Sequence, residues 1–406
     1  MDFLRVGAYP TERRTRGKFF GCGCLARTKD REDCGRKSLH PLAYRTSGVT
    51  VFAPKILKNQ CRRQSCAALH NKLVVQGGSP DAMTPSVLKL AVLGALAALL
   101  QAGIGAAAAR ASDIPAWLEA HVGEGDGQIA PVVLERARAL YLRKGVRNPC
   151  YFAFDATRPH DAGGGRLGRR FYVICEAQRS YRAISAGHGG GRDLEGLADF
   201  SNGRRCVKNF GNALDSELTA GGDYVTSETK DSFKGYYRGA GGKTPFVRTF
   251  IKFDGEGETG NARERAIGGH PAVLLKGLCR RKEPGDPQAD SDGYVRFGTL
   301  VNYAAGRSDG CTSWSPSDAE AVVAMVKDNP TTLYIYPESR DIAAVDQAVA
   351  AGQSSARAGV YWNAACMKAI GAPRFWRKET LEPILARYRQ AHPAPPPRPI
   401  PLCREP

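Results

Sequence analysis

Apolar side chains recur at helical spacing in residues 131–144, PVVLERARALYLRK. A helix drawn through this segment carries one apolar face, made of Val133, Leu134, Ala137, Leu140 and Tyr141. The pattern predicts an amphipathic helix within a helical lead that covers residues 112–149.

From about residue 150 to residue 300 the pattern changes to short apolar runs between glycine-rich turns. β-Branched and aromatic residues dominate these runs, which is typical of strands. Within this region the predicted strands are 171–175 (FYVIC), 181–185 (YRAIS) and 247–253 (VRTFIKF). A further strand is predicted at 332–336 (TLYIY).

A helix is predicted directly after Ser315. Ser315 is a favourable N-cap, Pro316 suits the first helical position, and Asp318 is placed as a capping-box partner. The apolar pattern AEAVVAMVKD stops at Asn329-Pro330, where the proline disfavours a helical residue before it.

A C-terminal helical extension is predicted over residues 341–392, followed by an extended proline-rich tail at 393–406. Trp362, Phe375 and Trp376 are expected to pack this extension onto the rest of the protein. The chain has no internal repeat. Together these patterns predict an α+β fold with a β-dominated mixed sheet, an N-terminal helical lead and a C-terminal helical extension.

Two glycine-containing motifs suggest ligand sites that their context does not support. GGGRLG at 163–168 matches a dinucleotide-binding pattern, but it leads into a strand, which favours a hairpin turn. Asp290 begins a DSDG run that resembles a calcium loop, yet the twelfth position is Thr299 instead of glutamate. No metal or cofactor is therefore expected.

The net charge of +18 first suggests a nucleic-acid partner. Residues 1–82 alone hold sixteen Lys or Arg and six Asp or Glu, and residues 112–406 retain a net charge of only +6. The excess lies mainly in the N-terminal part, so the composition argues against nucleic-acid binding by the rest of the chain.

The segment 83–111 has the composition of a secretory signal peptide. One lysine precedes an Ala/Leu-rich run, which ends in the small-x-small sequence Ala109-Arg110-Ala111. A membrane anchor is the alternative, although many small residues and Gln101 weaken it. The sequence predicts cleavage without a stable membrane span, and a periplasmic or cell-envelope location.

A signal peptide belongs at an N-terminus, so translation is expected to start at Met83. Residues 1–82 are then a misassigned extension; the alternatives are a disordered basic leader or a small metal-binding segment. Five cysteines in this part show no convincing zinc spacing. They are Cys22, Cys24, Cys34, Cys61 and Cys66.

Export changes the meaning of the remaining cysteines, because disulfides form in oxidising compartments. Seven cysteines follow residue 111, so at least one is left over within this part of the chain. They are Cys150, Cys175, Cys206, Cys279, Cys311, Cys366 and Cys403. The connectivity stays open, and Cys311 is the candidate for the free thiol because it lies in the polar turn GRSDGCTSWS.

A cysteine nucleophile needs a base, usually an imidazole. His188 and His270 follow predicted strands, where scaffolds present reactive groups, whereas His121, His160 and His392 are expected to be solvated. Gly310 permits close approach of the backbone to a substrate carbonyl, and turn N–H groups stabilise an oxyanion.

The order AGHG (186–189), FSN (200–202), NARERAIGGH (261–270) and GRSDGC (306–311) resembles the L,D-transpeptidase family of the YkuD type. It is closest to the branch described as murein L,D-transpeptidase catalytic domain-like, and the resemblance covers roughly residues 150–340. It implies an L,D-transpeptidase-like catalytic domain there, with Cys311 as nucleophile and His270 as base. Ser308 and Gly310 match the remaining motif positions and would shape the turn and oxyanion hole.

The chain departs from the family pattern near both catalytic positions. His270 is followed by Pro271 instead of glycine, and Ser313 stands where an arginine is typical. Asp309 replaces a second histidine and is expected to face away from the sulfur or to orient a partner. His188, Asp309 and Gly269 are the candidate substrate-binding residues, with His188 the second choice of base.

The resemblance implies acyl transfer on peptidoglycan stem peptides, without a cofactor. Cys311 would attack the bond before a terminal D-Ala and form a thioester that passes to an amine or to water. The sequence leaves cross-linking and L,D-carboxypeptidase activity both open, and it predicts no oligomeric state. The excess of Arg and Lys suits carboxylate-bearing peptides.

Two other classes of protein remain as alternatives. A catalytically altered envelope scaffold or wall-binding domain fits the departures near His270 and Cys311. A papain-like or NlpC-like hydrolase is less consistent, because its cysteine precedes its histidine, and only His392 follows Cys311.

Overall fold

Strand β1 (Tyr151–Asp155) is buried along its whole length, which places it between two layers of the fold. It pairs in parallel with β17 (Thr332–Tyr336) and antiparallel with β4 (Arg169–Cys175). Side chains of a strand alternate between its two faces. One face of these three strands packs against helix α3 (Pro131–Lys144), and the other contributes to the main hydrophobic core.

The computed structural model describes residues 114–303 and 307–404, which belong to one unit of the chain. The predicted leader at 1–82 and the predicted signal segment at 83–111 lie outside the described residues. No helix in the described part is long and apolar enough to cross a membrane.

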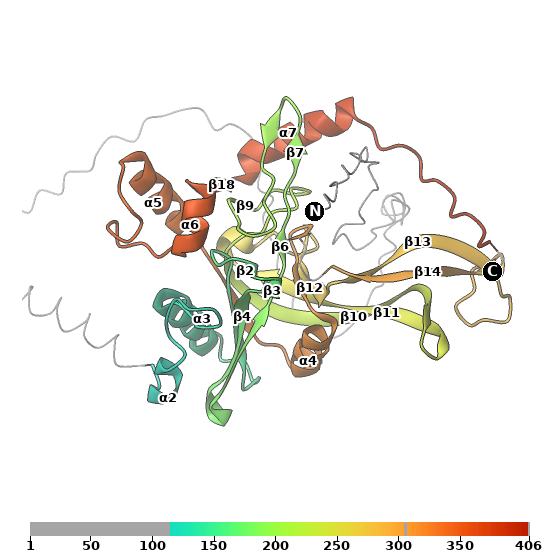
Figure 1. Cartoon of the computed structure of the whole chain (residues 1–406), viewed down its shortest axis with the longest axis horizontal. Coiled ribbons are helices and arrows are strands. Elements are labelled where there is room, and N and C mark those ends of the chain that lie inside the picture. Colours follow the sequence, from blue (N-terminus) through green and yellow to red (C-terminus); the bar gives the residue numbers. More distant parts are fainter. Residues whose placement is uncertain (1–113, 304–306, 405–406) are drawn as a thin grey trace, which may run out of the picture. The chain divides into compact units, whose positions relative to one another are not determined.

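The main sheet is mixed and has the order β16-β12-β11-β10-β17-β1-β4-β5, with β14 and β13 joined to it through β10. Its other strands are β5 (Ser180–Ser185), β10 (Gly222–Gly239), β11 (Gly242–Gly255), β12 (Gly268–Pro271), β13 (Val273–Lys282), β14 (Tyr294–Asn302) and β16 (Thr312–Trp314). Figure 1 shows β10, β11, β13 and β14 extending together as a long ribbon away from the helices.

Short strand pairs and two 3₁₀ turns (η1, Glu176–Gln178; η2, Gly257–Thr259) complete the β structure. The pairs are β2 (Asp161–Gly163) with β3 (Arg166–Leu167), β6 (His188–Gly189) with β15 (Arg307–Ser308), β7 (Asp193–Leu194) with β8 (Ala198–Asp199), and β9 (Asn209–Gly211) with β18 (Arg374–Trp376). The antiparallel β2–β3 pair confirms that GGGRLG forms a hairpin turn.

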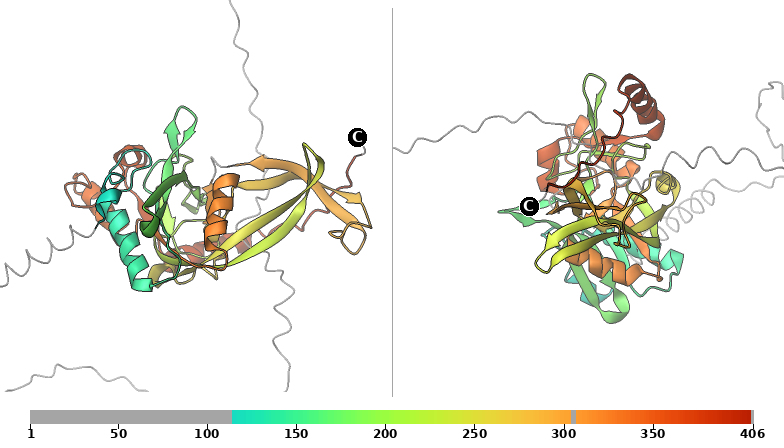
Figure 2. Two further views of the ribbon diagram at one scale, coloured as in Figure 1. Left: turned by 90° about the horizontal axis from the view of Figure 1, so that it is seen from below. Right: turned by 90° about the vertical axis from the view of Figure 1, so that its right-hand side faces the viewer.

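Helices lie on both faces of the sheet, as Figure 2 shows for α3 and α4 on its two sides. Besides α3, they are α2 (Ala116–Glu119), α4 (Pro316–Val326), α5 (Ser339–Ala350), α6 (Ala364–Ile370) and α7 (Lys378–Ala391). The main core combines buried residues of α4, α5 and the sheet with Trp362. The described part is therefore mixed α+β and dominated by strands, as the sequence predicts.

Helix α4 begins as predicted, with Ser315 as the N-cap and Pro316 at the first position. The Ser315 hydroxyl accepts a hydrogen bond from the Asp318 backbone N–H. The Asp318 carboxylate accepts from the Ser315 hydroxyl and pairs with Arg182, so it does not complete the predicted capping box.

The C-terminal extension is interrupted rather than continuously helical, because β18 separates α6 from α7. A disulfide between Cys206 and Cys366 ties α6 to the loop before β9. Trp362 packs edge-to-face on Phe210, and the Trp376 indole N–H donates to Asn209 Oδ1. These aromatic residues therefore pack the extension as predicted.

Candidate active site

Three segments that carry the sequence motifs meet near strand β16. β12 runs parallel to β16 with His270 opposite Ser313, and β6 runs parallel to β15 with His188 opposite Arg307. A single bridge joins Gly187 to Ser313. The AGHG, GGH and GRSDGC segments, far apart in the sequence, are therefore neighbours in the fold.

The turn before Cys311 depends on Gly310 and Ser308. Gly310 has φ +104°, and a Cβ at this position would lie 2.9 Å from both the Leu218 carbonyl oxygen and Ile267 Cδ1. Only glycine fits such a position without strain. The buried Ser308 hydroxyl donates a hydrogen bond to the Cys311 carbonyl oxygen, which closes the turn.

Cys311 lies just before β16, and its side chain is only 1% exposed. Its sulfur is 3.7 Å from the carbonyl oxygen of Ala266. Cys311 is disulfide-bonded in the structure, which differs from the predicted free thiol. The other six described cysteines form the pairs Cys150–Cys175, Cys206–Cys366 and Cys279–Cys403.

His270 is 1% exposed, and the orientation of its ring is set by a neighbouring carbonyl. Nδ1 lies 2.9 Å from the Pro271 carbonyl oxygen, which accepts a hydrogen bond from the N–H of this nitrogen. Burial and the positive charge of Arg248 lower the pKa of His270 to about 3. The imidazole is therefore neutral near pH 7, with its lone pair on Nε2, the form required of a general base.

Phe250 of β11 links the histidine to the cysteine. Its ring stacks on His270 at 6.0 Å between centroids, and it packs against Cys311 in a small buried cluster. Phe250 is the cross-strand neighbour of His270 in the β11–β12 pairing, so the two side chains share one face of the sheet. Cys311, which directly precedes β16, packs against Phe250 and therefore lies at this same face.

Gly269 faces the other side of the sheet. A Cβ there would overlap the ring of Trp314, which is buried in the main core. Packing against Trp314 thus explains why this position is a glycine, and it lies on the sheet face opposite to His270. The predicted substrate-binding role of Gly269 has no support in this arrangement.

His188 is completely buried, and both ring nitrogens have protein partners. Arg170 donates to Nδ1 over 2.7 Å, so Nε2 carries the proton and donates to the Gly203 carbonyl oxygen at 3.1 Å. Burial, followed by the charge of Arg170, holds the pKa of His188 well below its usual range. His188 has no lone pair directed at Cys311 and acts as a structural residue.

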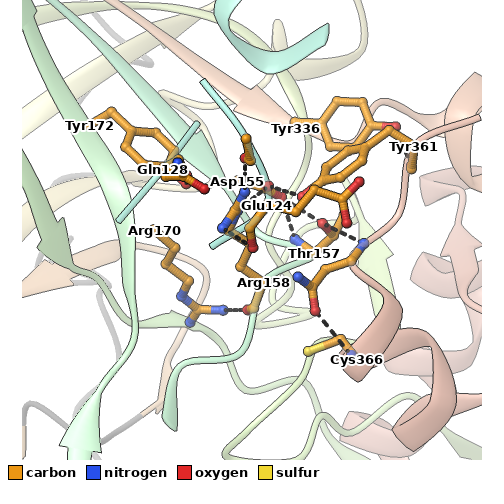
Figure 3. A network of polar contacts seen from close by, with 12 residues as sticks. Glu124, Gln128, Asp155, Thr157, Arg158, Arg170, Tyr172, Tyr336, Tyr361 and Cys366 are labelled. Carbon is orange, nitrogen blue, oxygen red and sulfur yellow. Dashed lines mark hydrogen bonds and ion pairs between the residues drawn. The ribbon is translucent and has the colours of Figure 1, made fainter. Parts of the chain in front are cut away.

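Arg170 connects His188 to a buried polar network. Its Nη1 donates to the Arg158 carbonyl oxygen, and the Arg158 guanidinium pairs with Asp155, which also accepts hydrogen bonds from Thr157 and Tyr361. Figure 3 shows Arg170 at the left of this network, with its guanidinium joined to Arg158 by a dashed line. Through Arg170, the network is therefore hydrogen-bonded to Ala186 and His188 of the AGHG segment.

The Asp309 carboxylate lies within electrostatic range of Glu217 and Tyr303. Its charge raises the pKa of Glu217 and of Tyr303. Burial and then Asp309 raise the pKa of Glu217 to about 7, although Arg192, 2.6 Å away, opposes this shift. Burial and the repulsion between carboxylates outweigh the ion pair.

The FSN motif supports the site through Asn202. Its amide nitrogen donates to the carbonyl oxygens of Gly189 and Asn209, and its amide oxygen accepts from the N–H groups of Lys208 and Asn209. With every hydrogen-bonding capacity used, this buried residue serves the loop structure.

The other histidines differ partly from expectation. His160 is buried, with Nδ1 3.1 Å from the Ala186 carbonyl oxygen, so the prediction of a solvated residue was wrong. The loop that carries it packs beneath the AGHG segment. His121 is partly exposed and stacks on Tyr181, whereas His392 is exposed and stacks on Tyr388.

Sequence reasoning missed Phe250, Arg248 and Tyr303 as neighbours of the candidate pair. The alternating pattern of residues 247–253 predicts the strand, but only the β11–β12 pairing brings its outward face to His270. The described residues contain no group of side chains arranged to hold a metal ion. A surface hollow lined by Asn212, Glu258 and Lys378 includes none of the candidate residues.

Comparison of the chain with family models, with curated proteins and with solved structures gave no match.

Proposed function

We propose that the protein, with Cys311 reduced, is an exported cysteine acyltransferase that acts on peptidoglycan stem peptides. In this proposal residues 150–340 form an L,D-transpeptidase-like catalytic core. The observation that carries it is that Cys311 and His270 both contact Phe250 at one face of the sheet.

The chemistry requires His270 to act as a general base during the attack. A neutral imidazole with a pKa of about 3 does not hold the thiol proton in the resting site. The proton moves to Nε2 as the sulfur bonds to the carbonyl carbon before the terminal D-Ala. When the C–N bond breaks, His270 returns this proton to the departing amine.

The turn supplies the hydrogen-bond donor for the intermediate. The Gly310 N–H donates to no acceptor among the described residues, and the turn that carries it is closed by Ser308. Such a preorganised donor stabilises the oxyanion of a tetrahedral intermediate. The thioester then passes to an amine, which gives a cross-link, or to water, which gives carboxypeptidase activity.

The proposal is tested by mass spectrometry of a purified stem tetrapeptide incubated with the full chain. A mild thiol reductant is included, because Cys311 is disulfide-bonded in the structure. We expect loss of D-Ala or formation of peptide dimers, and a protein adduct on Cys311. Cys311→Ala is expected to abolish the reaction, and His270→Gln to slow it at least a hundredfold.

The exposed His392→Gln serves as the matched control and should leave the rate unchanged. Full turnover by Cys311→Ala would refute the proposal. So would an unchanged peptide with wild-type protein in which the Cys311 thiol is shown to be reduced.

A second candidate is an envelope scaffold without catalytic activity. The burial of Cys311 and His270 and the disulfide at Cys311 favour it. In that case the reduced thiol reacts with iodoacetamide at the same rate in wild-type protein and in His270→Gln. A catalytic pair instead requires a slower reaction in the variant.

A further inference from the structure

We propose that Arg248 binds a carboxylate group of the peptide substrate beside Cys311 and His270. This inference rests on the proposed function and deepens it, since it names the substrate group that the site recognises. The ligand class is a peptide with a free carboxylate near the bond that is cleaved.

Strand register places Arg248 on the same face as the candidate pair. β11 and β12 are antiparallel with Ile251 opposite Gly269, so Phe250 is the cross-strand neighbour of His270. β11 is regular between Arg248 and Phe250 in its pairing with β10. Arg248, two residues before Phe250, therefore projects from the same face.

The positive charge of Arg248 changes the pKa of two groups near the candidate pair. It lowers the pKa of His270, and it lowers the pKa of Tyr303 against the larger effect of burial. Tyr303 is held near the end of β12 by its backbone N–H, which donates to the Ala272 carbonyl oxygen. The guanidinium thus lies within electrostatic range of both His270 and Tyr303.

No anion of the described part neutralises Arg248. Its Nε is buried without a hydrogen-bond acceptor, and it forms no ion pair with a described residue. Two lysines of the same ribbon are paired by contrast: Lys252 with Glu228, and Lys243 with Glu283 and Asp286. A partly buried guanidinium without a counterion is costly, and it is suited to bind a carboxylate through two parallel hydrogen bonds.

The first experiment measures peptide binding to full-length Cys311→Ala protein, in which no turnover occurs. Affinity is compared for a stem tetrapeptide with a free C-terminal carboxylate and for its C-terminal amide. We expect Arg248→Gln to weaken binding of the acid by about tenfold to a hundredfold and to leave the amide unchanged. Arg248→Lys should retain part of the preference for the acid, because it keeps the charge without the fork geometry.

The control variant is Arg238→Gln, which removes the same charge from the exposed far end of β10. It should bind both peptides like the parent. Equal loss of affinity for acid and amide, or no loss for either, would overturn the role of Arg248 while the acyl-transfer proposal stands.

The second experiment uses N-acetyl-D-alanine as a probe and follows the His270 ring signals by NMR at pH 7. A saturable shift is expected in the Cys311→Ala protein and not in the same protein with Arg248→Gln. If this difference is seen but stem peptides do not bind, the carboxylate site exists and the proposed substrate is wrong. Identical shifts in both proteins would overturn the site itself.

Discussion

Arg170 Nη2 lies 2.7 Å from Nδ1 of His188, and both side chains are completely buried. The same guanidinium donates to the Ala186 carbonyl oxygen through Nε and Nη2. Arg170 therefore holds both ends of the segment whose middle residue, Gly187, bridges to Ser313. A charge with no access to water thus aligns a backbone segment next to the candidate active site.

Replacing Arg170 with Met should strongly destabilise the fold. The substitution leaves the Arg158 carbonyl oxygen and the His188 Nδ1 without their donor and removes two hydrogen bonds to the Ala186 carbonyl oxygen. We expect a loss of about 3–5 kcal/mol in the free energy of unfolding, measured in urea. Arg169→Met is the control, because the neighbouring Arg169 is exposed and its pair with Asp126 contributes at most about 1 kcal/mol. Similar losses in the two variants would contradict this account.

Gly310→Ala should destabilise the turn before Cys311. The added Cβ meets the Leu218 carbonyl oxygen and Ile267 at 2.9 Å, in a backbone conformation with φ +104°. We expect a cost of about 2–3 kcal/mol and a lower melting temperature. At Gly285 a Cβ would meet nothing within 4 Å and the backbone does not have positive φ, so Gly285→Ala should unfold like the parent. Wild-type stability of Gly310→Ala would show that the turn adapts.

His270 should make the stability of the protein depend on pH in the acid range. Its pKa is lowered to about 3 in the folded state, from an ordinary value of about 6.5. Between these values the unfolded chain binds a proton that the folded protein does not, so stability falls as the pH is lowered from 6.5 toward 3. Relative to His270→Gln, wild-type protein should lose about 3 kcal/mol between pH 6.5 and 4. Parallel stability curves for the two proteins in urea would contradict the lowered pKa; His392→Gln serves as the control.

Glu217 should have the opposite effect on the neutral side. Its pKa is raised to about 7 in the folded protein, so the folded state binds the extra proton between its usual pKa and pH 7. Stability therefore falls as the pH rises through this window. Glu217→Gln removes this dependence and should gain about 1–3 kcal/mol relative to wild type between pH 5 and pH 8. The exposed Glu195→Gln is the control, and unfolding curves at the two pH values provide the measurement. A relative stability that does not change with pH would exclude the raised pKa.

The sequence predicts those helices and strands whose signals lie within a few neighbouring residues. The runs 171–175 and 332–336 form β4 and β17, and the Ser315-Pro316 sequence begins α4 as expected. Capping and alternation depend on neighbouring residues, so a single sequence contains this information. The mixed α+β class follows from the order of such elements.

The surroundings of the candidate site are less accessible to sequence reasoning. Phe250 and Arg248 belong to a predicted strand, but their proximity to His270 depends on the β11–β12 register. His160 lies in a polar stretch, yet it is buried because the loop folds under Ala186. The pairing of Cys206 with Cys366 across 160 residues likewise depends on tertiary structure. Long-range pairing decides each of these relations.

The Cys279–Cys403 disulfide joins the C-terminal segment to strand β13, where Cys403 N–H also donates to the Arg280 carbonyl oxygen. The connection between β13 and β14 lies inside the 124-residue loop that this bond closes. A protease that cuts this connection once would therefore produce two fragments that migrate together until a reducing agent is added.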